Sequence, residues 1–204
     1  MKFDTEHLHH WMQAIRNSEN PMRTMDAFWS GQLKSKEWLI DSLEFVIRPF
    51  INKKELSIDI HGGWVGVLAS MLFQSNLHIS TIRSIDIDHT CEPIANMMNR
   101  KEEIENRFKA ITEDMCNIHS DADIVINTSC EHITQNQYDI WLDQIKDSSL
   151  IVLQGNNYII DEHVRPSIDL PHFKAECHLE NVLWASELRL PLYTRYMVIG
   201  TKYV

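Results

Sequence analysis

The segment that decides the fold is Leu56-Ser57-Ile58-Asp59-Ile60-His61-Gly62-Gly63-Trp64-Val65-Gly66-Val67-Leu68-Ala69. It reads as an apolar strand with an acid near its end, then a turn that holds three of the chain's six glycines, then the start of a helix. Glycine permits positive φ and close approach of the backbone to a ligand. The first turn of the helix adds unpaired N–H groups and a positive dipole end. This order of features is typical of a loop that binds a nucleotide-type cofactor.

Strands and helices alternate from this segment onward. The pattern predicts strands at 56–60, 79–88, 107–111, 123–127 and 150–154, and helices at 65–74, 92–100 and 134–146. A spacing of roughly 25–30 residues between strands predicts right-handed crossovers and a parallel sheet. The end of the chain is different, because 173–184 and 193–203 are rich in residues that favour strands. These two segments predict a hairpin added to the sheet.

The N-terminal segment, from residue 4 to about 50, carries apolar residues at helical spacing. We expect two main helices and a short one lying across the mouth of the domain, with Trp11, Trp29 and Trp38 facing inward. The predicted organisation is an N-terminal helical cap, residues 1–54, and an α/β domain, residues 55–204, in one compact unit.

Composition narrows the function. The 204 residues carry a net charge of −10, whereas general nucleic-acid binding needs a basic surface, so nucleic acid is not the expected partner. Four scattered cysteines without a C-x-x-C pair favour a reducing, cytoplasmic location. The N-terminus is too polar and acidic for a signal peptide, and no apolar run is long enough to span a membrane. The eleven histidines form neither H-x-x-x-H nor H-E-x-x-H, so no metal site is predicted.

The order of motifs over about residues 55–204 resembles that of the class I S-adenosylmethionine (SAM)-dependent methyltransferases. The resemblance rests on the glycine turn, on Asp86 and Asp114 after the second and third strands, and on the segment 123–133. It implies an α/β, Rossmann-like fold: a seven-stranded, mostly parallel sheet with an antiparallel C-terminal hairpin and helices on both faces. It also implies methyl transfer with SAM as the cofactor.

The first motif departs from the family pattern of an acid followed by three glycines at alternate positions. Counted from the acid, a histidine takes the first glycine's place and a valine the third. A side chain therefore lies near the expected site of methionine and ribose. The resemblance assigns five residues of this turn to the cofactor: Asp59, His61, Gly62, Gly63 and Trp64.

Seven further residues are assigned to the cofactor by the same resemblance: Asp86, Ile87, Asp114, Met115, Asn127, Thr128 and Ser129. Asp86 would accept hydrogen bonds from both ribose hydroxyls, a task suited to a two-oxygen acceptor, and Ile87 would pack on the adenine. Asp114 would accept from the adenine amino group beside the backbone of Met115. The segment 127–129 would flank the methyl group.

Glu131 and His132 are the candidates for a general base, since a methyl acceptor must lose a proton and histidine titrates near neutral pH. The alternative is that this pair is structural. The loop after the fifth strand is unusually polar, and such loops carry substrate contacts. Four of its residues are predicted to meet the substrate, an O or N nucleophile on a small molecule: Asn157, Tyr158, His163 and Arg165.

Two other classes of function remain open. An NAD-type Rossmann oxidoreductase would share the glycine turn and Asp86, but its fingerprint is G-x-G-x-x-G, where this chain has G-G-x-x-G. A non-catalytic SAM-binding module is the second alternative, because the first motif is incomplete. The oligomeric state is also open, with a homodimer as one option.

Overall fold

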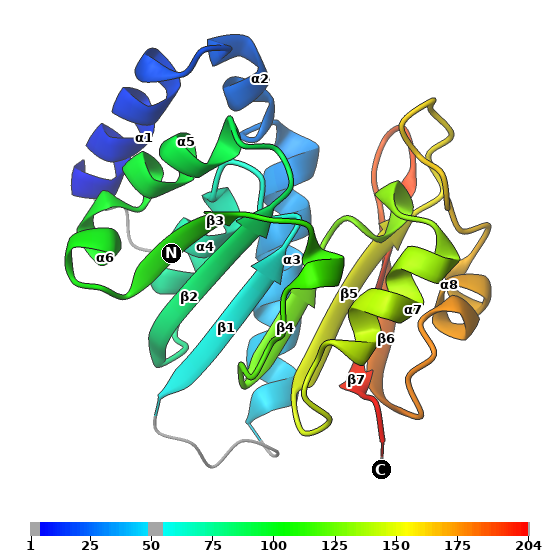
Figure 1. Ribbon diagram of the computed structural model, residues 1–204. Coiled ribbons are helices and arrows are strands. Elements are labelled where there is room, and N and C mark those ends of the chain that lie inside the picture. The colour runs from blue at the N-terminus through cyan, green and yellow to red at the C-terminus, as the bar shows by residue number, and fades with distance from the viewer. Residues whose placement is uncertain (1–4, 49–54, 204) are drawn as a thin grey trace.

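The computed structural model describes residues 5–48 and 55–203, which contain one seven-stranded sheet in the order β3-β2-β1-β4-β5-β7-β6 (Figure 1). Its strands are β1 (Leu56–His61), β2 (Ile79–Asp86), β3 (Phe108–Thr112), β4 (Ile124–Asn127), β5 (Leu150–Asn156), β6 (Asn181–Arg189) and β7 (Thr194–Thr201). The first five pair in parallel, and β7 runs antiparallel to both β5 and β6. The predicted sheet and its terminal hairpin are confirmed.

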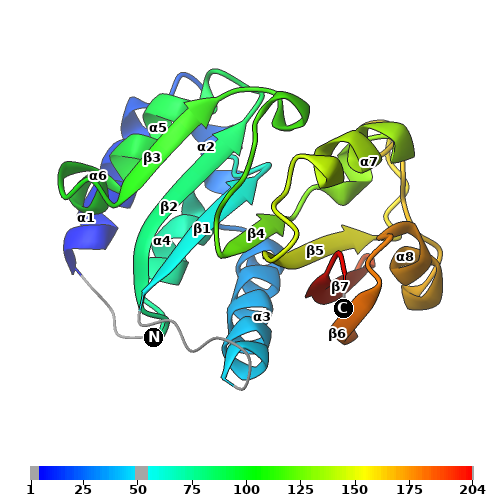
Figure 2. The ribbon, with the colours of Figure 1, turned by 60° about the horizontal axis from the view of Figure 1, so that its bottom comes forward.

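Helices cover both faces of this sheet (Figure 2). They are α1 (Thr5–Asn17), α2 (Pro21–Asp26), α3 (Ser30–Ile47), α4 (Val67–Phe73), α5 (Cys91–Met98), α6 (Arg100–Ile104), α7 (Gln135–Asp143) and α8 (Leu170–Glu176), with short 3-10 turns η1 (Met115–Asn117) and η2 (Cys130–His132). The helix α7 begins at a capping box in which Thr134 and Gln137 satisfy each other's backbone N–H groups, as the sequence predicts. None of the helices in 5–48 or 55–203 is long and apolar enough to cross a membrane.

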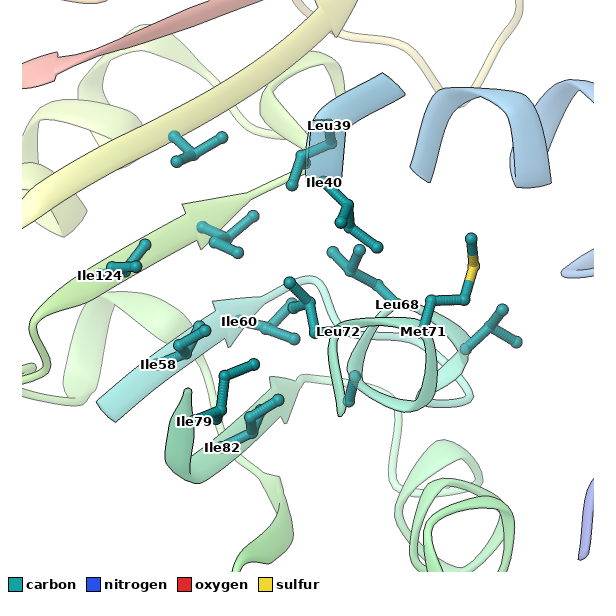
Figure 3. Close-up of a cluster of buried hydrophobic side chains, with 14 of the residues drawn as sticks. Leu39, Ile40, Ile58, Ile60, Leu68, Met71, Leu72, Ile79, Ile82 and Ile124 are labelled. Carbon is teal, nitrogen blue, oxygen red and sulfur yellow. The ribbon is translucent and has the colours of Figure 1, made fainter. Parts of the chain in front are cut away.

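Two apolar layers hold the sheet between its helices. On one face, Ile58, Ile60 and Ile124 pack with residues of α3 and α4, such as Leu39 and Leu72 (Figure 3). Successive strand residues point to opposite faces, so Val125 and Ile151 pack on the other face with Trp141 and Phe173, from α7 and α8. Burying one such aliphatic side chain contributes roughly 1.5–3 kcal/mol. The two layers hold the strands in place and so position their carboxyl ends.

The sequence led us to expect that the N-terminal helices lie together across the mouth of the domain. The structure does not have this arrangement. Helix α3 contributes Leu39 and Leu43 to the core and lies along the face of the sheet. The indole of Trp11 donates to Ser70 Oγ at 2.9 Å, while Trp38 packs on Trp184. Trp29 is exposed. The three tryptophans therefore serve separate places, and the boundary between residues 54 and 55 falls outside the described residues.

Two predicted elements are wrong in part. The segment 173–184 begins as a helix, because Asp169 caps α8 by accepting from the His172 N–H at 2.8 Å and Pro171 occupies its first turn. The strand β6 starts only at Asn181. The helix predicted at 92–100 breaks at the buried Asn99, whose Nδ2 donates to the carbonyl oxygens of Gly66 and Ala95. The break ties α5 to the glycine turn.

Candidate functional site

Most of the predicted cofactor residues gather near the point where the strand order reverses, between β1 and β4, whereas Asp59 and His61 do not. In open α/β sheets, ligands bind in the crevice outside the carboxyl ends of the strands at this switch point. The glycine turn follows β1, Asp86 ends β2, and Asn127 ends β4. These strand ends lie at one edge of the sheet, together with the loop after β5 and the β6–β7 turn, at the top of Figure 1.

The glycine turn is pressed between the residues that follow β4 and the end of β2. Gly62 has φ +67°, and a Cβ there would lie 2.7 Å from the Ser129 Cβ. A Cβ on Gly63 would overlap the hydroxyl of Ser84 in β2. Trp64 also has positive φ, at 48°. Glycine at 62 and 63 therefore reflects a lack of space as well as backbone geometry.

Asp86 organises the entry to this turn. Its Oδ2 accepts from the Trp64 N–H at 2.8 Å, and its Oδ1 accepts from the Asp88 N–H at 3.0 Å. An ionised carboxylate has about four acceptor positions, so two remain for a ligand. The neighbouring Ile87 is 72% exposed, so its side chain is available to pack on a ligand. A paired acid beside an open apolar side chain suits a ribose with its attached base.

Asp59 is turned into the sheet instead. It is buried, and its carboxylate accepts from Arg83 Nε at 2.7 Å, from a second nitrogen of the same guanidinium, and from the Ser120 hydroxyl. The hydrogen bond to Asp59 raises the pKa of Arg83. The Asp59 carboxylate therefore lies against Arg83 of β2 and Ser120, and not beyond the carboxyl ends of the strands where a cofactor would bind.

His61 is also directed into the core. Its side chain is 1% exposed and packs edge-on against Trp141 of α7, with ring centroids 5.6 Å apart. Burial lowers its pKa to about 4, so the ring is neutral at neutral pH. Neither ring nitrogen has a hydrogen-bond partner among the described residues. The side chain in the first glycine's place is therefore packed under α7.

The loops after β3 and β4 meet at this edge. Asp114 caps η1 by accepting from the Cys116 N–H at 2.9 Å. The next residue, Met115, lies beside β4, since Asn127 Nδ2 donates to its Sδ at 3.5 Å. Asn127 also accepts from the Ser129 N–H at 2.9 Å, which shapes the turn after β4. The structure therefore brings these four predicted cofactor residues together.

Glu131 is the centre of a buried network. Its Oε1 accepts from Asn156 Nδ2 and lies 3.4 Å from Arg195 Nη1. Arg195 also donates to the Thr128 carbonyl oxygen at 2.8 Å and to Gln154 Oε1 at 3.3 Å. The second carboxylate oxygen of Glu131 is buried and has no hydrogen-bond partner in the described part of the chain.

His132 and His163 lie next to this carboxylate, with ring centroids 4.7 Å apart. His132 Nδ1 is 3.1 Å from the Glu162 carbonyl oxygen, and His163 Nδ1 is 2.7 Å from that of Tyr158. A carbonyl oxygen only accepts, so each Nδ1 carries the proton and each Nε2 of the neutral ring keeps its lone pair. The sequence predicts separate roles for these two histidines, whereas the fold places their rings side by side.

The predicted substrate residues fall into two groups. Tyr158 stacks on Tyr193 of the β6–β7 turn, with centroids 5.4 Å apart, and stays half-buried near His163. Asn157 instead accepts from the Thr194 N–H at 2.8 Å. Arg165 donates to the Cys130 carbonyl oxygen and lies 4.5 Å over the ring of Tyr138. Asn157 and Arg165 therefore anchor the loop, whereas Tyr158 and His163 border the carboxyl ends of the strands.

Four residues that sequence reasoning did not single out complete this part of the site: Lys36, Asn156, Tyr193 and Arg195. Lys36 donates to Gln32 at 3.0 Å, and burial together with the charge of Arg195 lowers its pKa to about 7. The sequence carries one sign of this part of the site, which is Arg195, a charged residue inside the otherwise uncharged strand β7.

No family model matches the chain, and neither does any curated protein. Solved structures do. Magnesium protoporphyrin IX methyltransferase from Synechocystis PCC 6803 has a TM-score of 0.62 at 11% identity, covering 98% of this chain and 95% of its own. Geranyl diphosphate methyltransferase has 0.60 at 10% (84% and 78%), and ribosomal protein L11 methylase from Lactobacillus delbrueckii subsp. bulgaricus has 0.55 at 13% (82% and 79%). The chain therefore has the fold of the class I SAM-dependent methyltransferases, as its motifs predict.

Proposed function

We propose that the protein is a SAM-dependent methyltransferase that acts on an oxygen or nitrogen of a small molecule. The observation that carries this proposal is Asp86. It ends β2, the strand next to β1, holds the glycine turn through the Trp64 N–H, and keeps two acceptor positions beside the exposed Ile87. The Synechocystis magnesium protoporphyrin IX methyltransferase, of similar fold, was solved with SAM and with S-adenosylhomocysteine (SAH).

In this proposal the cofactor lies across the carboxyl ends of β2, β1 and β4. Asp86 accepts from the ribose hydroxyls, Ile87 covers one face of the adenine, and Asp114 accepts from its amino group. The segment 127–129 borders the methyl group. The acceptor's lone pair attacks the methyl carbon while the bond to sulfur breaks, which releases SAH. Holding the two reactants in line supplies most of the acceleration.

The acceptor approaches from the side of β5 and the β6–β7 turn. This side carries aromatic rings, Tyr158 stacked on Tyr193, and the exposed apolar residues Ile159 and Leu192. A small acceptor with an apolar body fits such a surface. Its proton passes to His132, whose Nε2 lone pair is free and whose ring is exposed.

Calorimetry with SAH and SAM tests the proposal. We expect both to bind, and we expect D86A to weaken SAH binding by about 1.5–3 kcal/mol, the usual worth of hydrogen bonds to a charged group. The control is D41N, which changes an exposed acid on α3. Absence of binding at millimolar SAM and SAH would overturn the proposal.

Two further measurements separate the alternatives. Tight binding of NAD in place of SAH would support an oxidoreductase. Binding of SAM without methyl transfer to any compound in a pool of cellular metabolites would support a non-catalytic module.

A further inference from the structure

We propose that Glu131, His132 and His163 form a binding site for one divalent transition-metal ion of the zinc class. One ligand-type atom from each of the three residues lies within 4.8 Å of those of the other two. Two imidazole nitrogens and one carboxylate oxygen are a common donor set for such ions. The sequence concealed the site, since His163 lies 31 residues after His132 and no local H-x-x-x-H motif exists.

The two histidines are held in the tautomer that metal binding needs. Each Nδ1–H is paired with a backbone carbonyl oxygen, that of Glu162 for His132 and that of Tyr158 for His163. Metal-binding histidines usually donate their second ring nitrogen in this way, which fixes the ring and raises the basicity of the ligating nitrogen. In the neutral tautomer that these hydrogen bonds select, each Nε2 offers its lone pair.

The carboxylate supplies independent evidence. Glu131 is 2% exposed, and its Oε1 is paired with Asn156 and Arg195, but its Oε2 has no hydrogen-bond partner among the described residues. Leaving a buried charged acceptor unpaired costs more than leaving a neutral one. A cation bound between this oxygen and the two imidazoles removes that cost. Arg195 pairs with the other oxygen, Oε1, and leaves Oε2 facing the two imidazoles without a donor from the described part of the chain.

The distances fit a site that closes by a small movement. With ligand bonds of about 2.05 Å, the ligands of a tetrahedral ion lie about 3.3 Å apart. His132 is exposed and His163 is half-buried, so each ring can tilt slightly while its Nδ1–H stays paired with its carbonyl oxygen. The loop itself is fixed, because the N–H groups of Val164 and Arg165 both donate to the Glu131 carbonyl oxygen, at 2.9 and 3.1 Å.

The consequence for catalysis rests on the proposed function. Three protein ligands leave a coordination position open. An acceptor hydroxyl bound there would lose its proton to solvent more readily, as a bound water does. Its oxygen would then take the methyl group from SAM, leaving SAH. In this form His132 is a ligand and the ion replaces it in promoting deprotonation, so the acceptor class is a hydroxyl compound.

Titration with Co²⁺, followed by its visible ligand-field absorption, tests the site on untagged protein stripped with a chelator. We expect one equivalent to bind and Zn²⁺ to displace it. H163A and H132A should each weaken binding by at least about tenfold, as loss of even a supporting contact does. E131Q, which keeps the shape of the side chain, should do the same. The matched control is H119A, an exposed histidine on another loop.

Three outcomes would overturn the proposal: no saturable binding by about 1 mM Co²⁺, equal binding by H163A and the unmodified protein, or equal loss in H119A. Thermal unfolding of each variant establishes that it is folded. SAH calorimetry on the same samples separates the two proposals. Cobalt binding without SAH binding would leave the metal site standing and remove the methyltransferase, and the reverse result would remove the metal site alone.

Discussion

His61 should make the protein sensitive to acid. Burial beside Trp141 lowers its pKa from 6.5 to about 4 in the folded state, with Asp59 opposing this shift and Arg83 adding to it. Between these two values the unfolded chain binds a proton that the folded chain does not, so stability falls as the pH falls. At about 1.4 kcal/mol per pH unit, this difference in pKa corresponds to about 3 kcal/mol of unfolding free energy. The protein keeps all of this stability above pH 6.5 and loses it as the pH falls to about 4.

The matched variant is H61L, which fills a similar volume and removes two buried nitrogens that have no hydrogen-bond partner in the described residues. Urea unfolding followed by circular dichroism would give the unfolding free energy of both proteins from pH 7 to 4. We expect the difference between them to grow in favour of leucine by about 3 kcal/mol as the pH falls. Groups that titrate independently of His61 contribute equally to both proteins, so they cancel in the difference.

A parallel decline of the two proteins would show that the His61 ring is charged or exposed in the folded state. The position of His61 under α7 would then be wrong. Heteronuclear NMR of the imidazole nitrogens provides a second check, because a neutral ring at pH 5.5 has a different pattern of nitrogen shifts from a charged one.

Three further predictions concern other positions. K36M should raise the unfolding free energy at pH 7 by about 2–4 kcal/mol. The reason is that the pKa of Lys36 is lowered from 10.5 to about 7 in the folded state, so the folded protein is penalised at every pH below 10.5. The gain should therefore shrink towards pH 10 in denaturation experiments. G62A should destabilise by more than the 1–2 kcal/mol of a left-handed backbone, since its Cβ meets Ser129, and adding S129G should recover only the steric part in thermal unfolding. N99A should cost about 0.5–1.5 kcal/mol in urea unfolding by removing the hydrogen bond from Asn99 Nδ2 to the Gly66 carbonyl oxygen, and an unchanged midpoint would contradict the link between α5 and the glycine turn.

The fold was predictable because its signals are local. The run Ile124–Ile126 is apolar at every position, which matches a strand buried on both faces. The start of α8 was missed although its signals were present, since Asp169 and Pro171 are a helix start that β-forming residues nearby outweighed. Where neighbouring residues favour a helix and a strand at once, tertiary packing decides which of the two forms.

The candidate site was predictable only where it follows the chain. Asp86 and the glycine turn are each recognised from a few adjacent residues. The partners of Glu131 come from elsewhere, because β7 inserts between β5 and β6 and its register sets Arg195 opposite Asn156. That register depends on which strand pairs with which. No spacing along the sequence reveals it, and the same reason hid the pairing of His132 with His163.

The incomplete glycine motif has a physical explanation. Gly62 and Gly63 stand where a Cβ would meet Ser129 and Ser84, so these two positions allow no side chain. The first glycine's place is different, since its side chain points under α7 and a histidine is accommodated there. Glycine is thus kept where a Cβ would clash and is replaced where the side chain packs under α7. The departure at His61 does not narrow the edge where a cofactor would lie, so it does not favour a non-catalytic module over an enzyme.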